Sequence, residues 1–295
     1  MKELVVISGK GGTGKTSLLA AFASMASRMA LCDADVDAAD LHLIVAPAVR
    51  ERHSFTSGHR AVIDPDRCTA CGICVELCQW RAIRADFTID PIACEGCGVC
   101  HYLCPEGAVD FPENRCGEWY LSDTRFGPMV HARLGIAEEN SGKLVSLVRR
   151  EARHLGETGG LELILTDGPP GIGCPVIAAI GGADAVLIVT EPTLSGIHDL
   201  QRVAGLADHF KVPAMISVNK HDLNPEMTTR IETYAETSGL VLAGNVPFDP
   251  QFTKAMVQGM TIFEQGGSSP ATEAVRELWQ RVCAKLGLTA PSVCE

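Results

Sequence analysis

The sequence of 295 residues lacks three features that would each indicate a class of protein. Basic residues are not in excess: 25 Lys and Arg face 36 Asp and Glu, and the formal charge of −11 argues against a nucleic-acid surface while allowing a cationic protein partner. No membrane span is predicted, since the longest apolar run, residues 176–189, contains Asp184 and two glycines. No signal peptide is expected, so the 13 cysteines are expected to bind metal in a reducing cytoplasm rather than to form disulfides.

A glycine-rich loop follows the first apolar segment. Residues 4–7 read as a buried strand, and the stretch from Gly9 to Thr16 fits the pattern G-x-x-x-x-G-K-[ST], whose backbone N–H groups converge on phosphate oxygens. A helix is predicted from Lys15, whose ammonium would reach the β- and γ-phosphates, and the Thr16 hydroxyl would ligate Mg²⁺. The predicted nucleotide-binding residues of this loop are Gly9, Lys10, Gly11, Gly12, Thr13, Gly14, Lys15, Thr16 and Ser17.

Dense cysteine, glycine and proline replace the α/β pattern between about residues 54 and 116. Two runs spaced C-x₂-C-x₂-C-x₃-C occur there, as in two-cluster bacterial ferredoxins, where the fourth cysteine of each run ligates the other cluster. The predicted ligands are Cys68, Cys71, Cys74 and Cys104 for one [4Fe–4S] cluster and Cys94, Cys97, Cys100 and Cys78 for the second. The alternative is two zinc sites made of CxxC pairs. Gln79 stands where the pattern has proline, which removes no ligand but leaves the backbone near that cluster undetermined.

The remaining chain alternates apolar strands with helical patterns. Strands are predicted at residues 30–32, 161–166, 185–190, 214–219 and 240–246. The strand at 161–166 leads into Asp167 and a loop of glycines and prolines. This pattern predicts an α/β fold with a mostly parallel sheet covered by helices on both faces. The helix predicted at residues 272–286 has one apolar stripe and is expected to pack on the core rather than on a membrane.

The loop sequence GKGGTGKT, with a second lysine at position 10, resembles that of the MinD/ParA/nitrogenase-iron-protein class of ATPases. The resemblance implies that Lys10 reaches the phosphates of the partner subunit in a dimer. It also implies that Asp37 orients the attacking water, that Asp33 lies near the Mg²⁺ shell and that Asp167 holds a Mg²⁺-bound water.

The acidic segment from Asp33 to Asp40 has a simpler alternative, a polar turn in which Asp37 or Asp40 caps a helix. We favour a catalytic role for Asp37 and interpret Asp35 and Asp40 as turn residues.

The resemblance also places Asn219 on adenine, and Pro247 and Asp249 against the base. The N-K-x-D segment that begins at Asn219 is, however, also how guanine is selected in GTP-binding proteins. ATP is favoured by the resemblance, and these residues leave GTP open.

Over nearly its whole length the chain resembles MinD-superfamily P-loop ATPases that carry an inserted ferredoxin domain. The expected division is an ATPase domain at 1–53 and 117–295, interrupted at 54–116 by an α+β ferredoxin-like domain with two [4Fe–4S] clusters. The resemblance implies ATP and Mg²⁺ as ligands, a homodimer or a heterodimer with a paralogous ATPase, and a redox protein as partner.

Three functions are compared. The first is an ATP-gated electron carrier, in which Lys10, Lys15, Asp37 and Asp167 support hydrolysis. The second is an iron–sulfur carrier of the Mrp type, although those relatives use a CxxC pair near the C-terminus that this sequence lacks. The third is a positioning ATPase that only binds partners, for which eight ligand cysteines would be superfluous. A further cysteine, Cys174, is near where nitrogenase-like proteins place an intersubunit cluster ligand, but no second such ligand is evident.

Overall fold

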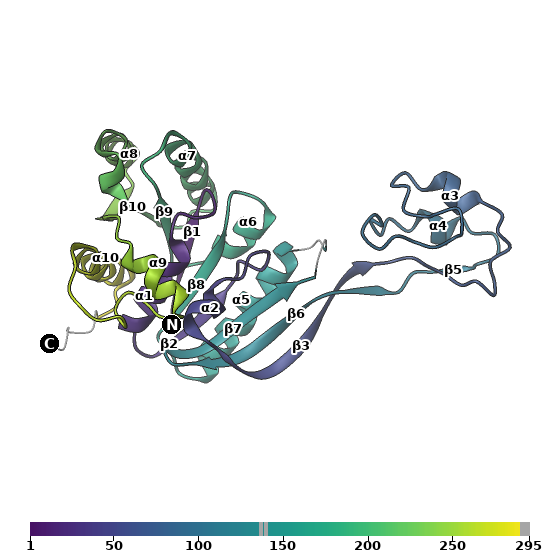
Figure 1. Ribbon diagram of the computed structural model, residues 1–295, viewed down its shortest axis with the longest axis horizontal. Coiled ribbons are helices and arrows are strands. Elements are labelled where there is room, and N and C mark those ends of the chain that lie inside the picture. Colours follow the sequence, from purple (N-terminus) through teal and green to yellow (C-terminus); the bar gives the residue numbers. More distant parts are fainter. Residues whose placement is uncertain (136–137, 139–140, 290–295) are drawn as a thin grey trace. The chain divides into compact units, whose positions relative to one another are not determined.

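A computed structural model describes residues 1–135, 138 and 141–289 of the chain (Figure 1). The chain divides into two compact units. Unit 1 comprises Met1–Arg52, Trp119–Arg133 and the chain from Ser141 onward, and unit 2 comprises His53–Glu118 and the short segment that begins at Leu134. All eight cysteines of the two runs lie in unit 2.

Nine strands form one sheet in the order β11-β10-β9-β1-β8-β2-β7-β6-β3. They are β1 (Lys2–Ser8), β2 (Met29–Asp33), β3 (Ala48–His59), β6 (Glu113–Thr124), β7 (Gly127–Leu134), β8 (Leu163–Pro170), β9 (Ala185–Thr190), β10 (Ala214–Asn219) and β11 (Val241–Val246). Neighbours from β11 to β7 all pair in parallel. The predicted mostly parallel sheet is confirmed, with β6 and β7 added as a hairpin that turns at Arg125 and Phe126.

Helices cover both faces of this sheet. Helices α1 (Lys15–Met25), α2 (Leu41–Val45) and α10 (Pro270–Leu286) share a core with Leu4 and Val6 of β1. The intervening residues Val5 and Ile7 are also fully buried, because α5 (Ser141–Thr158), α6 (Cys174–Ile180), α7 (Leu194–His209) and α8 (Pro225–Thr237) pack on the sheet from its other face. Two short elements, η1 (His221–Leu223) and α9 (Gln251–Val257), lie in the connections that follow β10 and β11.

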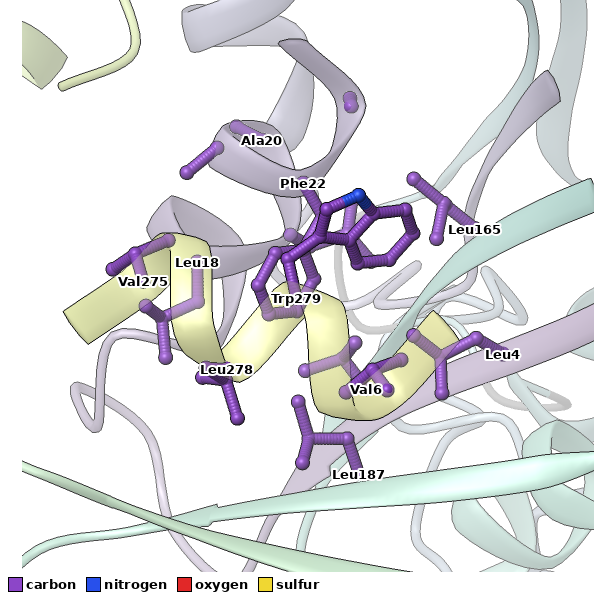
Figure 2. Packing of buried hydrophobic residues seen from close by; sticks show 14 of the residues in the cluster. Leu4, Val6, Leu18, Ala20, Phe22, Leu165, Leu187, Val275, Leu278 and Trp279 are labelled. Atoms are coloured by element: carbon purple, nitrogen blue, oxygen red, sulfur yellow. The ribbon is translucent and has the colours of Figure 1, made fainter. Parts of the chain in front are cut away.

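The last helix packs in the core, as predicted. Figure 2 shows Trp279 of α10 beside Phe22 of α1, and their ring centroids are 5.0 Å apart. Val275 and Leu278 lie on the same buried stripe of α10 and are completely inaccessible to solvent. Each such side chain contributes about 1.5–3 kcal/mol by leaving water, so this stripe fixes α10 on α1 and on the sheet.

Strand β8 differs from its prediction. It runs from Leu163 to Pro170 and therefore includes Asp167 and the start of the expected loop. Ser8 pairs with Pro170, which extends the sheet beyond the end of the apolar run. Because β2 and β8 are parallel neighbours, Asp33 pairs with Asp167, and the two acids come together at the carboxyl edge of the sheet.

Unit 2 contains short elements only, apart from the ends of β3 and β6. Strands β4 (Val62–Ile63) and β5 (Val109–Asp110) pair antiparallel, and helices α3 (Ile73–Leu77) and α4 (Val99–Tyr102) each follow a glycine with positive φ. Within the residues that the structure describes, none of the helices combines the length and the apolar character needed to cross a bilayer.

Candidate functional site

The phosphate loop joins β1 to α1, and α1 begins at Lys15 as predicted. Gly14 has a φ of 88°, and a Cβ there would lie 2.4 Å from Nδ2 of Asn219. That nitrogen donates to the carbonyl oxygen of Thr13 at 2.7 Å. Position 14 therefore accepts only glycine, both for its backbone conformation and for the approach of β10.

The first two residues of α1 contact acids at the carboxyl ends of β2 and β8. Nζ of Lys15 lies 2.7 Å from Oδ2 of Asp35 and 3.3 Å from Oδ1 of Asp167. The Thr16 hydroxyl donates to the other oxygen of Asp167 at 2.7 Å. All these side chains except that of Thr16 are buried. The structure thus brings together Lys15, Thr16 and Asp167 as a predicted phosphate and Mg²⁺ site requires.

The ammonium of Lys15 pairs with the buried carboxylates of Asp35 and Asp167, and the buried carboxylate of Asp33 adds a third negative charge nearby. Burial raises the pKa of Asp167, and burial together with the Asp167 charge raises the pKa of Asp33. Burial opposes the charged form of Lys15, but Asp167 and Asp35 outweigh it and raise the pKa of this lysine. Oδ2 of Asp33 is buried and, within the described residues, has no hydrogen-bond partner. An excess of buried carboxylate oxygens fits a hard divalent cation.

Asp35 begins a turn as predicted, because its carbonyl oxygen accepts the backbone N–H of Ala38 at 3.1 Å, but the turn interpretation missed that its carboxylate is buried against Lys15. A signal was present in the sequence: Asp33 and Asp35 are two residues apart after a buried strand, and residues at that spacing face the same side of an extended chain. Asp40, interpreted in the same way, occupies the N-cap position of α2 without a capping bond from its side chain.

Asp37, the predicted catalytic acid, lies in an exposed turn after β2. Its carboxylate lies near the hydroxyl of Ser141, the first residue of α5. Burial and the charge of Asp35 raise the pKa of Asp37, and the nearby Ser141 hydroxyl opposes that rise. Asp37 does not contact Lys15 and remains a predicted catalytic residue.

Lys10 lies on the other side of the loop from these acids. Its Nζ is 3.4 Å from Oε2 of Glu191, which follows β9, and 3.3 Å from the hydroxyl of Ser195 on α7. Helix α7 approaches the loop closely, since a Cβ at Gly9 would lie 2.2 Å from Cβ of Asp199. The sequence reasoning missed Glu191, which no motif marks.

The N-K-x-D segment braces the phosphate loop. Asn219 bonds the Thr13 carbonyl, and Nζ of Lys220 lies 3.3 Å from the Gly12 carbonyl. Both contacts use side chains that a sequence motif assigns to base recognition, so the segment also has a structural role. The contact of Asn219 with adenine remains a prediction.

The loop after β11 is fixed by acids. Asp222 accepts the backbone N–H of Phe248 at 2.7 Å. Asp249 accepts from the N–H of Gln251 and from the hydroxyl of Ser269, each at 2.9 Å. Pro247, partly buried, directly precedes Phe248. The base contacts of Pro247 and Asp249 remain predictions.

Unit 2 contains two cavities, and each is lined by four cysteines. The first is lined by Cys68, Cys71, Cys74 and Cys104. The second is lined by Cys78, Cys94, Cys97 and Cys100. These are the two groups that the spacing assigns to separate clusters. Elsewhere the linings are mainly apolar and include Phe87 in the first and Phe111 in the second.

The thiols surround a space instead of converging on a point. Among residues 1–135, 138 and 141–289, no three His, Cys, Asp or Glu side chains are arranged to hold a single metal ion.

The two cysteine runs also repeat each other in local geometry. Sγ of Cys78 accepts the backbone N–H of Ala82 at 3.3 Å, and Sγ of Cys104 accepts that of Ala108 at the same distance. Gln79 in place of proline therefore leaves the turn after Cys78 like the turn after Cys104.

The comparisons with known proteins identify the nucleotide-binding part. The model of the CobQ/CobB/MinD/ParA nucleotide-binding domain matches residues 4–262. The chain belongs to this family. An uncharacterized protein of Methanocaldococcus jannaschii, MJ0578, is 30% identical over 95% of this chain and 96% of its own length. An iron–sulfur cluster carrier protein of Pyrococcus abyssi is 23% identical over 96% of this chain and 86% of its own.

Two solved structures share the fold of this family member. The MinD cell division protein of Aquifex aeolicus is 21% identical, with a TM-score of 0.57 and 99% of each chain covered. MinD of Pyrococcus horikoshii OT3, solved with Mg-ADP, is 16% identical, with a TM-score of 0.57 and 95% of each chain covered. The family recognised from the phosphate loop is confirmed.

Proposed function

We propose that this chain is a P-loop ATPase that pairs with a second copy or a paralogue when it binds ATP, and that its nucleotide state controls electron transfer through two [4Fe–4S] clusters in unit 2. One observation carries the proposal: each cavity of unit 2 collects the four cysteines that the spacing assigns to one cluster. Cysteine ligands at this spacing are typical of clusters that carry electrons between proteins.

The residues of unit 1 fit Mg-ATP. The loop N–H groups and the start of α1 would hold the phosphates, and Lys15 would pair with the β- and γ-phosphates. Thr16 and Asp167 would hold Mg²⁺, directly and through water, beside the unpartnered oxygen of Asp33. Bound Mg²⁺ neutralises charge on the phosphates. Asp37 would orient the attacking water, and Lys10 would act across the pair.

The residues of unit 2 fit the clusters. Thiolates around zinc each lie about 2.3 Å from one ion, whereas a cubane needs a space between its four thiolates, and the two cavities supply it. The backbone N–H groups of Ala82 and Ala108 are placed to stabilise the thiolates of Cys78 and Cys104. Bound clusters supply one-electron transfer.

The test is metal analysis of protein purified without oxygen. We expect about eight irons and eight sulfides per chain, the content of two cubanes. Cys78→Ser should lose iron from one cluster, whereas Cys116→Ser should retain all of it, because Cys116 is buried in unit 2 but lines neither cavity. Zinc in place of iron, or equal iron in the two variants, would refute the assignment.

An iron–sulfur carrier is the second candidate, supported by the name of the Pyrococcus abyssi relative. A carrier gives its cluster to an acceptor, whereas an electron-transfer protein keeps it. Incubation of the iron-loaded protein with an apo-ferredoxin and Mg-ATP separates the two: loss of iron to the acceptor would favour the carrier, and retained iron with repeated reduction would favour the electron carrier.

A further inference from the structure

Glu191 holds two lysines that come from different parts of the nucleotide site. It directly follows β9, and its side chain is 15% exposed. Its Oε1 lies 2.5 Å from Nζ of Lys220, and its Oε2 lies 3.4 Å from Nζ of Lys10. One largely buried carboxylate therefore connects the lysine that marks the phosphate loop to the lysine that follows β10.

The order of the strands produces this arrangement. Strands β10, β9 and β1 are neighbours, and all three are parallel. Their carboxyl ends therefore reach the same edge of the sheet. Lys220 follows β10, Glu191 follows β9 and Lys10 follows β1, so the acid lies between the two lysines by topology.

The two lysines are held unequally. Lys220 makes the shorter contact with Glu191 and also donates to the Gly12 carbonyl at 3.3 Å. Lys10 makes the longer contact, and its other partners are the hydroxyls of Ser195 and Thr193 at 3.3 and 3.5 Å. Lys10 can therefore leave while Lys220 keeps the carboxylate in place.

The lysine at the other end of the loop is held differently. Lys15 is buried between Asp35 and Asp167, at 2.7 and 3.3 Å, within its own chain. The side chain of Lys10 is 33% exposed and that of Lys15 is 9% exposed. The loop thus carries one fixed lysine and one that is held loosely near the surface.

We propose that Glu191 is a positioning residue for Lys10. Its carboxylate keeps the Lys10 ammonium against the start of α7 within its own chain, and the lysine leaves this contact for the phosphates of the other subunit when ATP brings two chains together. Glu191 thereby sets the ATP concentration at which pairing begins. This inference rests on the proposed ATP-dependent pairing.

The test measures pairing by sedimentation as a non-hydrolysable ATP analogue with Mg²⁺ is added. Glu191→Gln keeps the shape of the side chain and an oxygen that accepts from Lys220, but removes the charge that holds Lys10. We expect half-maximal pairing at an analogue concentration about two- to fivefold lower, the range for loss of a partly exposed ion pair. Asp184→Asn, which removes an acid paired with Lys2 just before β9, should leave that concentration unchanged.

A second measurement tests whether Glu191 acts only by bracing the loop through Lys220. Under dilute conditions where the chain is monomeric, Lys220→Met should weaken analogue binding because it removes the bond to Gly12, whereas Glu191→Gln should not. Equal weakening by the two variants would overturn the proposal. If Glu191→Gln does not fold, Glu191→Asp takes its place, because an aspartate is too short to reach both lysines. It should lower the analogue concentration for half-maximal pairing in the same way.

The outcomes separate the two proposals. A wild-type chain that stays monomeric with the analogue would refute ATP-dependent pairing, and the role of Glu191 would fall with it. A wild-type chain that pairs, with no shift in Glu191→Gln, would refute the role of Glu191 alone.

Discussion

Replacing Lys15 by methionine should destabilise the protein much more than replacing Lys10 by methionine. In Lys15→Met, the buried carboxylates of Asp35 and Asp167 lose their shared cation. Breaking a buried pair in this way costs about 3–5 kcal/mol, because a charge is left without compensation. Lys10→Met is the matched control: its ion pair with Glu191 is longer and partly exposed, so the loss should stay below about 1 kcal/mol.

The loss in Lys15→Met should also depend on pH. The pKa of Asp33 and that of Asp167 are already raised by burial, and removal of the lysine takes away a charge that lowers both. A carboxyl whose pKa is higher in the folded than in the unfolded state binds its proton more tightly when the protein is folded. The folded state therefore gains stability as the pH falls toward the unfolded pKa of about 3.9. The decrease in the free energy of unfolding caused by Lys15→Met should therefore be smaller at pH 5 than at pH 8.

Urea unfolding at both pH values measures this loss. A Trp80→Phe background removes the tryptophan of unit 2, so that Trp119 and Trp279 report on unit 1. The midpoint and slope of each curve give the free energy of unfolding. Equal losses for the two lysine variants, or a Lys15→Met loss that is the same at pH 5 and pH 8, would show that the carboxylates do not depend on Lys15.

Three further predictions concern nucleotides. Lys15→Ala should weaken ATP binding measured by calorimetry, whereas Lys10→Ala should leave binding largely intact and abolish hydrolysis and pairing; equal loss of binding would contradict separate roles. Gly14→Ala should weaken ATP binding and should destabilise unit 1 by about 1–2 kcal/mol for the left-handed backbone alone. The control is Gly205→Ala on α7, where a Cβ meets nothing, and it should change neither ATP binding nor stability. The reduction potentials of both proposed clusters should differ between protein with ADP and protein with a non-hydrolysable ATP analogue, because a nucleotide that shifts a potential must bind oxidised and reduced protein unequally. Identical potentials and identical rates of partner reduction would mean that the nucleotide does not control the clusters.

The local features of the phosphate loop were predictable because they depend on neighbours in sequence. Glycines that adopt positive φ, a helix that starts at Lys15 and an apolar strand before them can be read from short patterns. The grouping of the eight cysteines of unit 2 into two sets of four follows from their C-x₂-C-x₂-C-x₃-C spacing in the same way. Such patterns describe which residues a turn can bring together.

The acids around the loop were less predictable because they come from distant strands. Asp35 reaches Lys15 and Glu191 reaches Lys10 only because β2 and β9 lie on opposite sides of β1 and β8 in the sheet. The order of strands in a sheet is set by the packing of the whole unit, so neither contact has a signature within its own segment. The extension of β8 to Pro170 has the same origin, since Pro170 pairs with Ser8.

Because Asp37 lies near Ser141, a change at the nucleotide that moves Asp37 would act on the start of α5. Further along this helix, Arg149 is bonded to both carboxylate oxygens of Glu3 at 2.8 Å, and Arg153 to one of them at 2.7 Å, so the helix is anchored to β1. The start of α5 directly follows the short segment that belongs to unit 2. A movement of Asp37 would therefore act on the first turn of α5, one end of a helix that is anchored further along.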